Sequence, residues 1–263
     1  MTDFTSIDLK IENGFARVTL NQPDRGNPID GAFCRDIRVL AAQLAAMPDL
    51  RAVLITAKGR VFSVGGDIRS FSSSRENISR LVQDWTADLH SGLARLRRIN
   101  APVIVSVHGN IAGGSVSFMA FADVVLTARN IKISAAFSMI GFCADSGSTV
   151  SLSERMGVAR AKRFLLLSET LTAEEAQAAG LVDFVHDAEE LEAATEALAK
   201  KLANGPTRAF GKIKETMRTV NSSTLESQLE DEAQALAEIA ASDDAWEGIT
   251  AFGEKRAPRF TGR

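Results

Sequence analysis

The chain has 263 residues, of which 45% are hydrophobic and 24% are charged, and its net charge is −3. These values are ordinary for a soluble globular protein, and they exclude a disordered chain, a collagen and a disulfide-rich mini-domain. The even charge predicts no nucleic-acid partner and no membrane partner, and Cys34 and Cys143 alone provide no disulfide framework. The amino terminus lacks a signal-peptide pattern, so we expect a cytoplasmic protein.

Strands and helices are predicted to alternate along the first 185 residues. In chain order we expect strands at 6–12 and 16–20 around the Asn13-Gly14 turn, a helix at 29–47, a strand at 52–56 and a helix at 78–99. A strand at 103–107, a helix at 113–121, strands at 124–127 and 131–134, a helix at 146–156 and a strand at 181–185 follow. Thr172 and Glu175 have the spacing of a capping box.

From residue 187 to about 252 the pattern is helical, with a break at 204–206. This order predicts an α/β core over residues 1–200 and a helical region over residues 201–263.

Residues 99–122 contain no Asp, Glu, Lys or Arg, which is the length of a membrane span. Pro102, Gly109, Gly113 and Gly114 interrupt the run. We therefore predict a buried strand, a turn and a buried helix there.

Two glycine-bearing loops each follow a predicted buried strand, at residues 59–68 and 107–116. Glycine lets a backbone approach a ligand closely, and the first N–H groups of a helix have no partner within that helix. Two such loops facing one point could hold a thioester oxygen that becomes an enolate. The three histidines and two cysteines have no metal-ligand spacing, so no metal is expected.

The segments FSVGGDI, APVIVSVHGNIAGGSVSF, FADVV, LTAEEAQAAGLVDFV and NGPTRAFGKIK resemble the crotonase (enoyl-CoA hydratase/isomerase) family, as does the closing EGITAFGEKRAPRFTGR. The resemblance runs from about residue 6 to the end of the chain. It implies an α/β spiral of ββα units, with a C-terminal helical region that forms trimers or dimers of trimers. It also implies an acyl-CoA substrate, with coenzyme A as part of that substrate and no separate cofactor.

By the same resemblance, the backbone N–H groups of Val64 and Gly114 would hold the thioester oxygen. Ten further residues would surround the substrate: Arg25, Gly65, Gly66, Asp67, Ile68, His90, Gly113, Phe137, Lys255 and Phe260. Lys255 and Phe260 would do so across a subunit boundary, and Asp67 also fits the cap of the helix that follows it.

Catalytic carboxylates differ within the family. The two glutamates of hydratases correspond to Ser117 and Phe137, which can act neither as acid nor as base, so ordinary hydration is doubtful. Asp145 stands where several double-bond isomerases of the family carry an aspartate. We therefore expect an enoyl-CoA isomerase in which Asp145 is the single acid and base; the competing interpretation is that Asp145 caps the helix at 146–156.

Three other functions remain open at this point. A hydratase-like lyase would need another group in place of the glutamates. A 4-chlorobenzoyl-CoA dehalogenase would use Asp145 as nucleophile and His90 as base, although Phe137 replaces the tryptophan of those enzymes. A non-catalytic relative would bind only coenzyme A thioesters or RNA. Fatty-acid metabolism and phenylacetate degradation both fit the isomerase.

Overall fold

The computed structural model describes residues 3–73 and 75–263. Its centre is a six-stranded sheet in the order β1 (Ile7–Glu12), β2 (Phe15–Leu20), β3 (Ala52–Ala57), β4 (Val103–Val107), β6 (Val124–Ala128) and β9 (Phe184–His186). Among the described strands of this sheet, only the β1–β2 pair, which forms a hairpin, is antiparallel. All five residues of β4 are buried, as a parallel strand covered on both faces requires.

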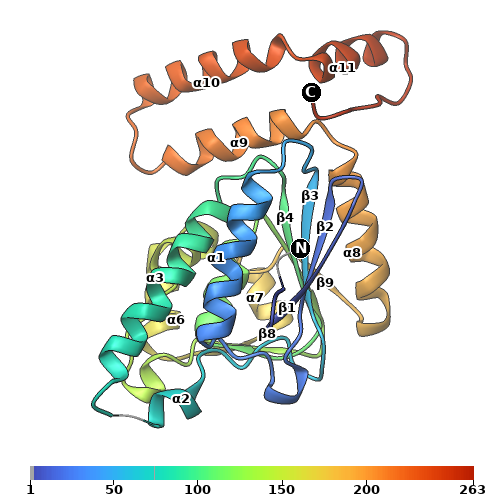
Figure 1. The fold of residues 1–263 in the computed structure, drawn as a ribbon. Coiled ribbons are helices and arrows are strands. Elements are labelled where there is room, and N and C mark those ends of the chain that lie inside the picture. The colour runs from blue at the N-terminus through green and yellow to red at the C-terminus, as the bar shows by residue number, and fades with distance from the viewer. Residues whose placement is uncertain (1–2, 74) are drawn as a thin grey trace.

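Helices cover both faces of this sheet. Figure 1 shows α1 (Gly31–Ala45) and α3 (Ile78–Leu96) side by side on one face and α8 (Ala188–Ala203) on the other. The chain between the main strands also forms α2 (Ile68–Ser72), α4 (Gly114–Ala120), α5 (Ser148–Met156), α6 (Val158–Leu166) and α7 (Ala173–Ala178). Two short 3₁₀ turns lie at Pro23–Arg25 and Ser138–Ile140.

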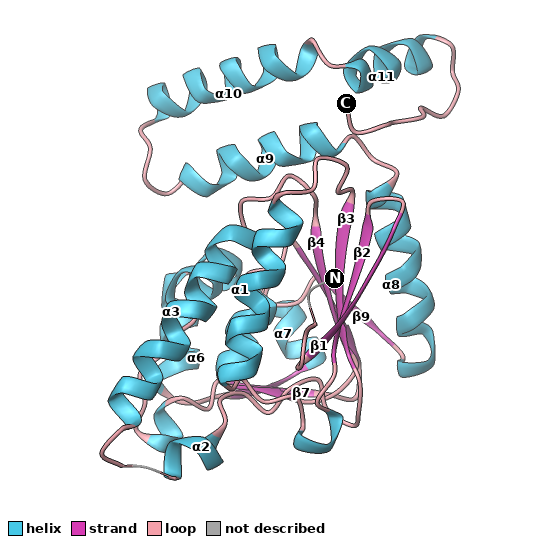
Figure 2. Ribbon diagram, viewed as in Figure 1, coloured by secondary structure: helices cyan, strands magenta, loops and turns pink. Residues whose placement is uncertain are grey.

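A second, smaller sheet was not predicted. It contains β5 (Ile111–Ala112), β7 (Lys132–Ser134) and β8 (Thr170–Thr172), and Figure 2 shows β7 running across the end of the main sheet. The strand expected at 131–134 is confirmed as β7, whereas β5 and β8 have only two and three residues and are too short for an alternation of apolar and polar residues to identify them. The small sheet matters here because β5 joins the second glycine loop to the rest of the fold.

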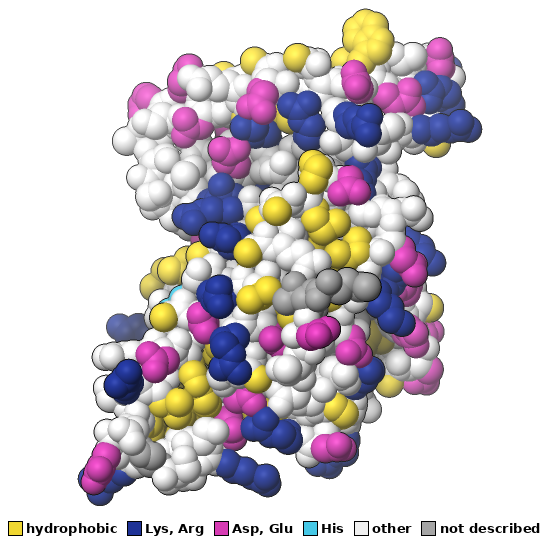
Figure 3. Space-filling model, in the orientation of Figure 1, with side chains coloured by type: hydrophobic (Ala, Val, Ile, Leu, Met, Phe, Trp, Pro, Cys, Tyr) yellow, Lys and Arg dark blue, Asp and Glu magenta, His cyan; other side chains and the backbone are white. Residues whose placement is uncertain are grey.

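The last three helices form a separate arm above the body, made of α9 (Thr207–Thr219), α10 (Leu225–Ala240) and α11 (Asp243–Gly253) (Figure 1). The expected boundary at residue 201 falls inside α8, which packs on the main sheet, so the arm begins instead at α9. The arm exposes large apolar side chains, including Leu236, Trp246 and Phe252, the last with 88% of its surface exposed. Figure 3 shows apolar side chains on its outer surface.

Several local predictions are confirmed. Asn13 and Gly14 both have positive φ in the β1–β2 turn, and Thr172 and Glu175 form a capping box at α7. The uncharged run at 99–122 becomes β4, β5 and α4, and none of the described helices is long and apolar enough to cross a membrane. The strand expected at 181–185 is shifted, because Leu181 and Val182 lie buried in the turn that follows α7 and β9 starts only at Phe184.

Candidate active site

The first glycine loop runs beside the segment that precedes α1. The N–H of Ile29 donates to the carbonyl of Gly65 at 2.8 Å, and the N–H of Asp67 donates to the carbonyl of Ile29 at 3.1 Å. In an extended chain the N–H of the intervening residue points the other way. The N–H of Gly66 accordingly has no acceptor among the residues that the structure describes.

The geometry of this loop corrects one expected donor. The N–H of Val64 already donates to the carbonyl of Gly26 at 2.9 Å, so this amide is not free to bind a substrate oxygen. The side chain of Val64 does line the site, whereas the free amide of the loop belongs to Gly66, two residues later. The sequence pattern could not distinguish them, because which N–H is free depends on the segment at residues 26–29.

The second glycine loop meets the first directly. Gly113 has φ +57°, and α4 starts at Gly114, whose N–H lies in the first turn and has no acceptor within the helix. The Ser63 and Ser115 hydroxyls are 2.5 Å apart and join the two loops. A Cβ atom on Gly65 would lie only 2.5 Å from the carbonyl oxygen of Ala112, so only glycine fits there. The free amides of Gly66 and Gly114 therefore belong to two segments that touch.

Both amides border a cavity of about 720 Å³. Its walls come from the two loops, from α2 and α3, and from the segment at residues 136–146. Of the residues predicted for the site, the structure brings seven to this cavity: Val64, Gly66, Ile68, Gly113, Gly114, Phe137 and Asp145.

Asp145 supplies the only carboxylate among the described residues that line the cavity. The competing role as a helix cap is not observed, because α5 starts at Ser148, its N-cap residue is Gly147, and no side chain caps it. A Cβ atom built on Gly114 would lie 3.8 Å from Oδ1 of Asp145, which places this oxygen next to Gly114.

Burial raises the pKa of Asp145 above its ordinary value, and the Ser146 hydroxyl and His90 beside it offset part of that rise. A carboxylate with a raised pKa is a stronger base. Cys34, also at the cavity, is not a competing base, because burial and nearby aspartates raise the pKa of its thiol to about 12.

His90 positions the turn that carries Asp145. Its Nε2 atom accepts a hydrogen bond from the N–H of Ser146 at 3.2 Å, and Ser146 has a left-handed backbone with φ +54°. Such a conformation is unfavourable for serine and persists only where neighbours hold it. His90 itself does not line the cavity, so the expectation that it contacts the substrate is corrected to a contact with this turn.

Neither of the two residues expected to correspond to the hydratase glutamates, Ser117 and Phe137, is an acid. Phe137 lies in the cavity wall. Ser117 is completely buried on α4, and its hydroxyl has no hydrogen-bond partner among the described residues.

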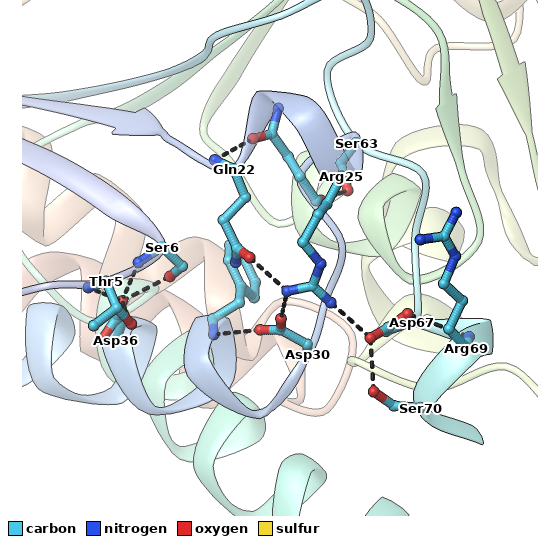
Figure 4. Close-up of polar contacts among 12 residues, drawn as sticks. Thr5, Ser6, Gln22, Arg25, Asp30, Asp36, Ser63, Asp67, Arg69 and Ser70 are labelled. Atoms are coloured by element: carbon cyan, nitrogen blue, oxygen red, sulfur yellow. Dashed lines mark hydrogen bonds and ion pairs between the residues drawn. The ribbon is translucent and has the colours of Figure 1, made fainter. Parts of the chain in front are cut away.

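Arg25 and Asp67 support the first loop from outside the cavity. Figure 4 shows the Arg25 guanidinium between two carboxylates, at 2.6 Å from Asp30 and 2.8 Å from Asp67. Asp30 accepts the N–H of Phe33 and caps α1, while Asp67 accepts the N–H of Arg69 and caps α2, as expected for Asp67. The Arg25 guanidinium is therefore bound to both capping carboxylates. Neither Arg25 nor Asp67 lines the cavity.

The remaining three expected residues are not at the cavity within this chain. Gly65 faces Ala112 behind the loop, where it sets the spacing of the two loops. Lys255 and Phe260 follow α11 at the far end of the molecule from α2 (Figure 1). The ring of Phe260 packs against Gly248, and its carbonyl accepts a hydrogen bond from Arg51.

Comparison with known proteins identifies the family. The family model for enoyl-CoA hydratase/isomerase matches residues 10–263. The chain belongs to the enoyl-CoA hydratase/isomerase family. It is 33% identical to a probable enoyl-CoA hydratase of Rhodobacter capsulatus, with 99% of each chain covered. It is 32% identical to the 1,2-epoxyphenylacetyl-CoA isomerase of Escherichia coli, with 96% of this chain and 97% of the relative covered.

The crystal structure of an enoyl-CoA hydratase from a Polaromonas species matches with a TM-score of 0.90 and 27% identity, over 97% of this chain and 99% of that one. The crotonase fold expected from the sequence is confirmed. The family implies an acyl-CoA thioester as substrate and includes both hydratases and isomerases. The described residues contain no group of three or more His, Cys, Asp or Glu side chains that could hold a metal ion.

Proposed function

We propose that this protein is an acyl-CoA isomerase that moves a carbon–carbon double bond, with Asp145 as its single acid and base. The observation that carries the proposal is that Asp145 is the one carboxylate on the described cavity wall and lies beside Gly114. The substrate would be an enoyl thioester of coenzyme A.

The reaction needs only one proton-transferring group. With the thioester oxygen held by the N–H groups of Gly66 and Gly114, Asp145 removes a proton from the α-carbon of a 3-enoyl thioester. The electron pair spreads over the γ-carbon, the α-carbon and the thioester oxygen as a dienolate, and the two amides stabilise its charge. Asp145 then returns the proton to the γ-carbon, which gives the 2-enoyl product and regenerates the carboxylate.

Hydration requires two proton-transferring groups, whereas the described cavity wall carries one carboxylate. Adding water requires one group to activate the water and another to protonate the α-carbon. By the family resemblance, Ser117 and Phe137 correspond to the residues that would supply these groups, and neither side chain transfers a proton near neutral pH. The relatives bear names of both kinds: the Escherichia coli protein is named an isomerase of an epoxide thioester, and the Rhodobacter capsulatus protein a probable hydratase, so the proposal rests on the site and not on these names.

The test is incubation of the protein with 3-enoyl-CoA and 2-enoyl-CoA thioesters in D₂O, with products followed by mass and absorbance. We expect the double bond to migrate, with deuterium at the α- or γ-carbon and no gain of water. Formation of a hydroxyacyl-CoA would replace the proposal with a hydratase. Absence of any exchange would leave a dehalogenase, tested with 4-chlorobenzoyl-CoA, or a binding protein.

We also propose that the chain forms a homotrimer or a dimer of trimers through the arm α9–α11. The support is the set of large apolar side chains that the arm exposes, since apolar surface of this extent is typical of an interface. The variant Phe252→Glu is expected to shift the protein toward monomers in light scattering coupled to gel filtration. Ala94→Glu on the exposed side of α3 is the control and should leave the mass unchanged. A wild-type protein that is already monomeric would contradict this proposal.

A further inference from the structure

Another cavity, of about 470 Å³, lies between the body and the arm. Leu50 and Arg51, which line it, come directly before β3, and Asn100 and Ala101 come shortly before β4. The two glycine loops follow these same strands. Because β3 and β4 are parallel, the cavity and the loops lie at opposite ends of the main sheet, roughly 20 Å apart over the six residues of β3.

This cavity is lined by an excess of cations. Asp49 carries the only carboxylate among the described residues that line it. Arg97 of the nearby segment is paired with Glu154 at 2.6 Å, but it does not line the cavity. Figure 3 shows basic side chains gathered at the notch between the arm and the body. The five cations that do line the cavity are Arg51, Arg95, Arg98, Arg208 and Arg263.

Four of these five arginines extend toward solvent with little pairing. Arg95, Arg98 and Arg263 are exposed and form no ion pair with any of the described residues. Arg208 lies 3.8 Å from Glu238, at the outer limit of an ion pair. Guanidinium groups gathered at one cavity repel one another, and an anion between them would relieve this repulsion.

Arg51 adds a buried charge that no anion balances. Only 9% of its surface is exposed. Its Nε and Nη2 atoms donate to the carbonyls of Ala203 at 2.9 Å and Gly205 at 2.7 Å, and Nη1 has no partner among the described residues. The charge of Asp244 acts on this guanidinium, but the Asp244 carboxylate accepts the N–H groups of residues 261 and 262 at 2.6 and 2.8 Å. A buried charge without a counterion is costly, so a nearby anion would be stabilised.

The first turn of α9 adds uncharged donors at the same cavity. Thr207 and Arg208 both line it, and their N–H groups have no acceptor among the described residues. No side chain caps this helix of thirteen residues. The Thr207 hydroxyl is buried and also has no partner among those residues. The amino end of a helix carries partial positive charge, which favours an anion there.

From these observations we infer that this cavity binds a phosphate group. Phosphate oxygens accept hydrogen bonds from guanidinium groups in pairs and from the N–H groups at a helix start, and both kinds of donor are present. The cavity also has apolar walls at Leu44, Leu50 and Ile99, which leaves room for a larger group that carries the phosphate. The site would join the end of α3 to the start of α9, and it is independent of the reaction proposed at Asp145.

The test is calorimetric titration of the whole protein with inorganic phosphate, at an ionic strength held constant with chloride. We expect one saturable site per chain with a dissociation constant below about 1 mM. The double variant Arg95→Gln, Arg98→Gln should bind at least about 10-fold more weakly, because two charge-assisted contacts are lost. The double variant Lys10→Gln, Lys162→Gln removes two exposed cations elsewhere and should keep the wild-type affinity. Absence of saturable binding, or an unchanged affinity in the arginine variant, would overturn the inference.

Thr207→Val separates phosphate binding from a role in the fold alone. Without phosphate we expect a melting temperature equal to or above that of the wild type, because the hydroxyl has no partner to lose. With phosphate we expect a smaller rise in melting temperature than in the wild type. A lower melting temperature without phosphate, together with the full rise on adding it, would overturn the placement of the phosphate at α9.

Adenosine 5′-monophosphate, titrated in the same way, distinguishes two sources of the phosphate group. An affinity at least about 10-fold higher than that of inorganic phosphate would assign the site to a phosphate carried on a larger molecule. An equal or lower affinity would assign it to free phosphate. Neither titration involves turnover, so failure of the proposed isomerisation would leave these results unaffected.

Discussion

Asp145→Asn is expected to lose at least about 10³-fold in isomerisation rate, because the amide can neither remove nor return a proton. The same change is expected to raise the melting temperature at neutral pH. Burial raises the pKa of Asp145, which means that the folded protein holds its ionised form at a cost. The asparagine has nearly the same shape and carries no charge, so this cost disappears.

The sign of the pH dependence follows from the same shift. A carboxyl with a raised pKa in the folded state binds its proton more tightly there than in the unfolded chain. The stability of the wild type therefore falls as the pH rises from the ordinary aspartate pKa through the raised one. The isomerisation rate is expected to fall as the pH is lowered, because acid protonates the Asp145 carboxylate that acts as the base. Thermal melts and rates of both proteins across this pH range should show the melting temperatures converging at low pH.

A matched control is Asp84→Asn on α3, where the aspartate is exposed and 3.9 Å from Arg80. This variant should keep both activity and melting temperature near the wild type. An Asp145→Asn protein with more than a tenth of the wild-type rate would contradict the role of this residue. A lower melting temperature would mean that the carboxylate stabilises the fold instead.

Gly65→Ala is expected to lose about 10²-fold or more in rate and to lower stability. Gly65 has φ +86°, a conformation that costs other residues roughly 1–3 kcal/mol. The new Cβ would also lie 2.5 Å from the carbonyl oxygen of Ala112, which is backbone and can move only with the whole second loop. Separating the loops would misalign the amides of Gly66 and Gly114, and one such donor is worth about 3–4 kcal/mol in other enzymes.

The control is Gly253→Ala at the end of α11, where a new Cβ would meet nothing within 4 Å. Rates and melting temperatures of the two variants should differ sharply, with Gly253→Ala close to the wild type. A Gly65→Ala protein that is less stable but fully active would show that the relative position of the loops does not control the reaction.

The sequence predicts the core of this protein well and its site less completely. The buried strand β4 and the amphipathic helix α1 can be predicted from local patterns. A strand buried on both faces is a run of mostly apolar residues, and a helix buried on one face has apolar residues at helical spacing. Asp145 was identified through resemblance, and its competing role as a cap was removed only by the geometry of α5. Helix ends depend on a few dihedral angles that sequence patterns define poorly.

The amide donor shows a different limit. Every residue except proline has an N–H, so nothing in the letters of residues 62–67 distinguishes the amide of Val64 from that of Gly66. The distinction arises from Gly26 and Ile29, which are distant in sequence and take up the amides on either side. The contact of His90 with Ser146 is equally non-local, since 56 residues separate the partners. A sequence shows which groups exist, whereas the fold determines which of them remain unpaired.

The double contact of Arg25 has a consequence for how this region moves. One guanidinium holds the carboxylates that cap α1 and α2, so a displacement of either helix end is transmitted to the other and to the loop between them. The first turns of α1 and α2 and the loop that carries Asp67 are therefore expected to move together. Moving the first turn of α2 away from the first turn of α1 therefore requires breaking at least one of the two ion pairs of Arg25.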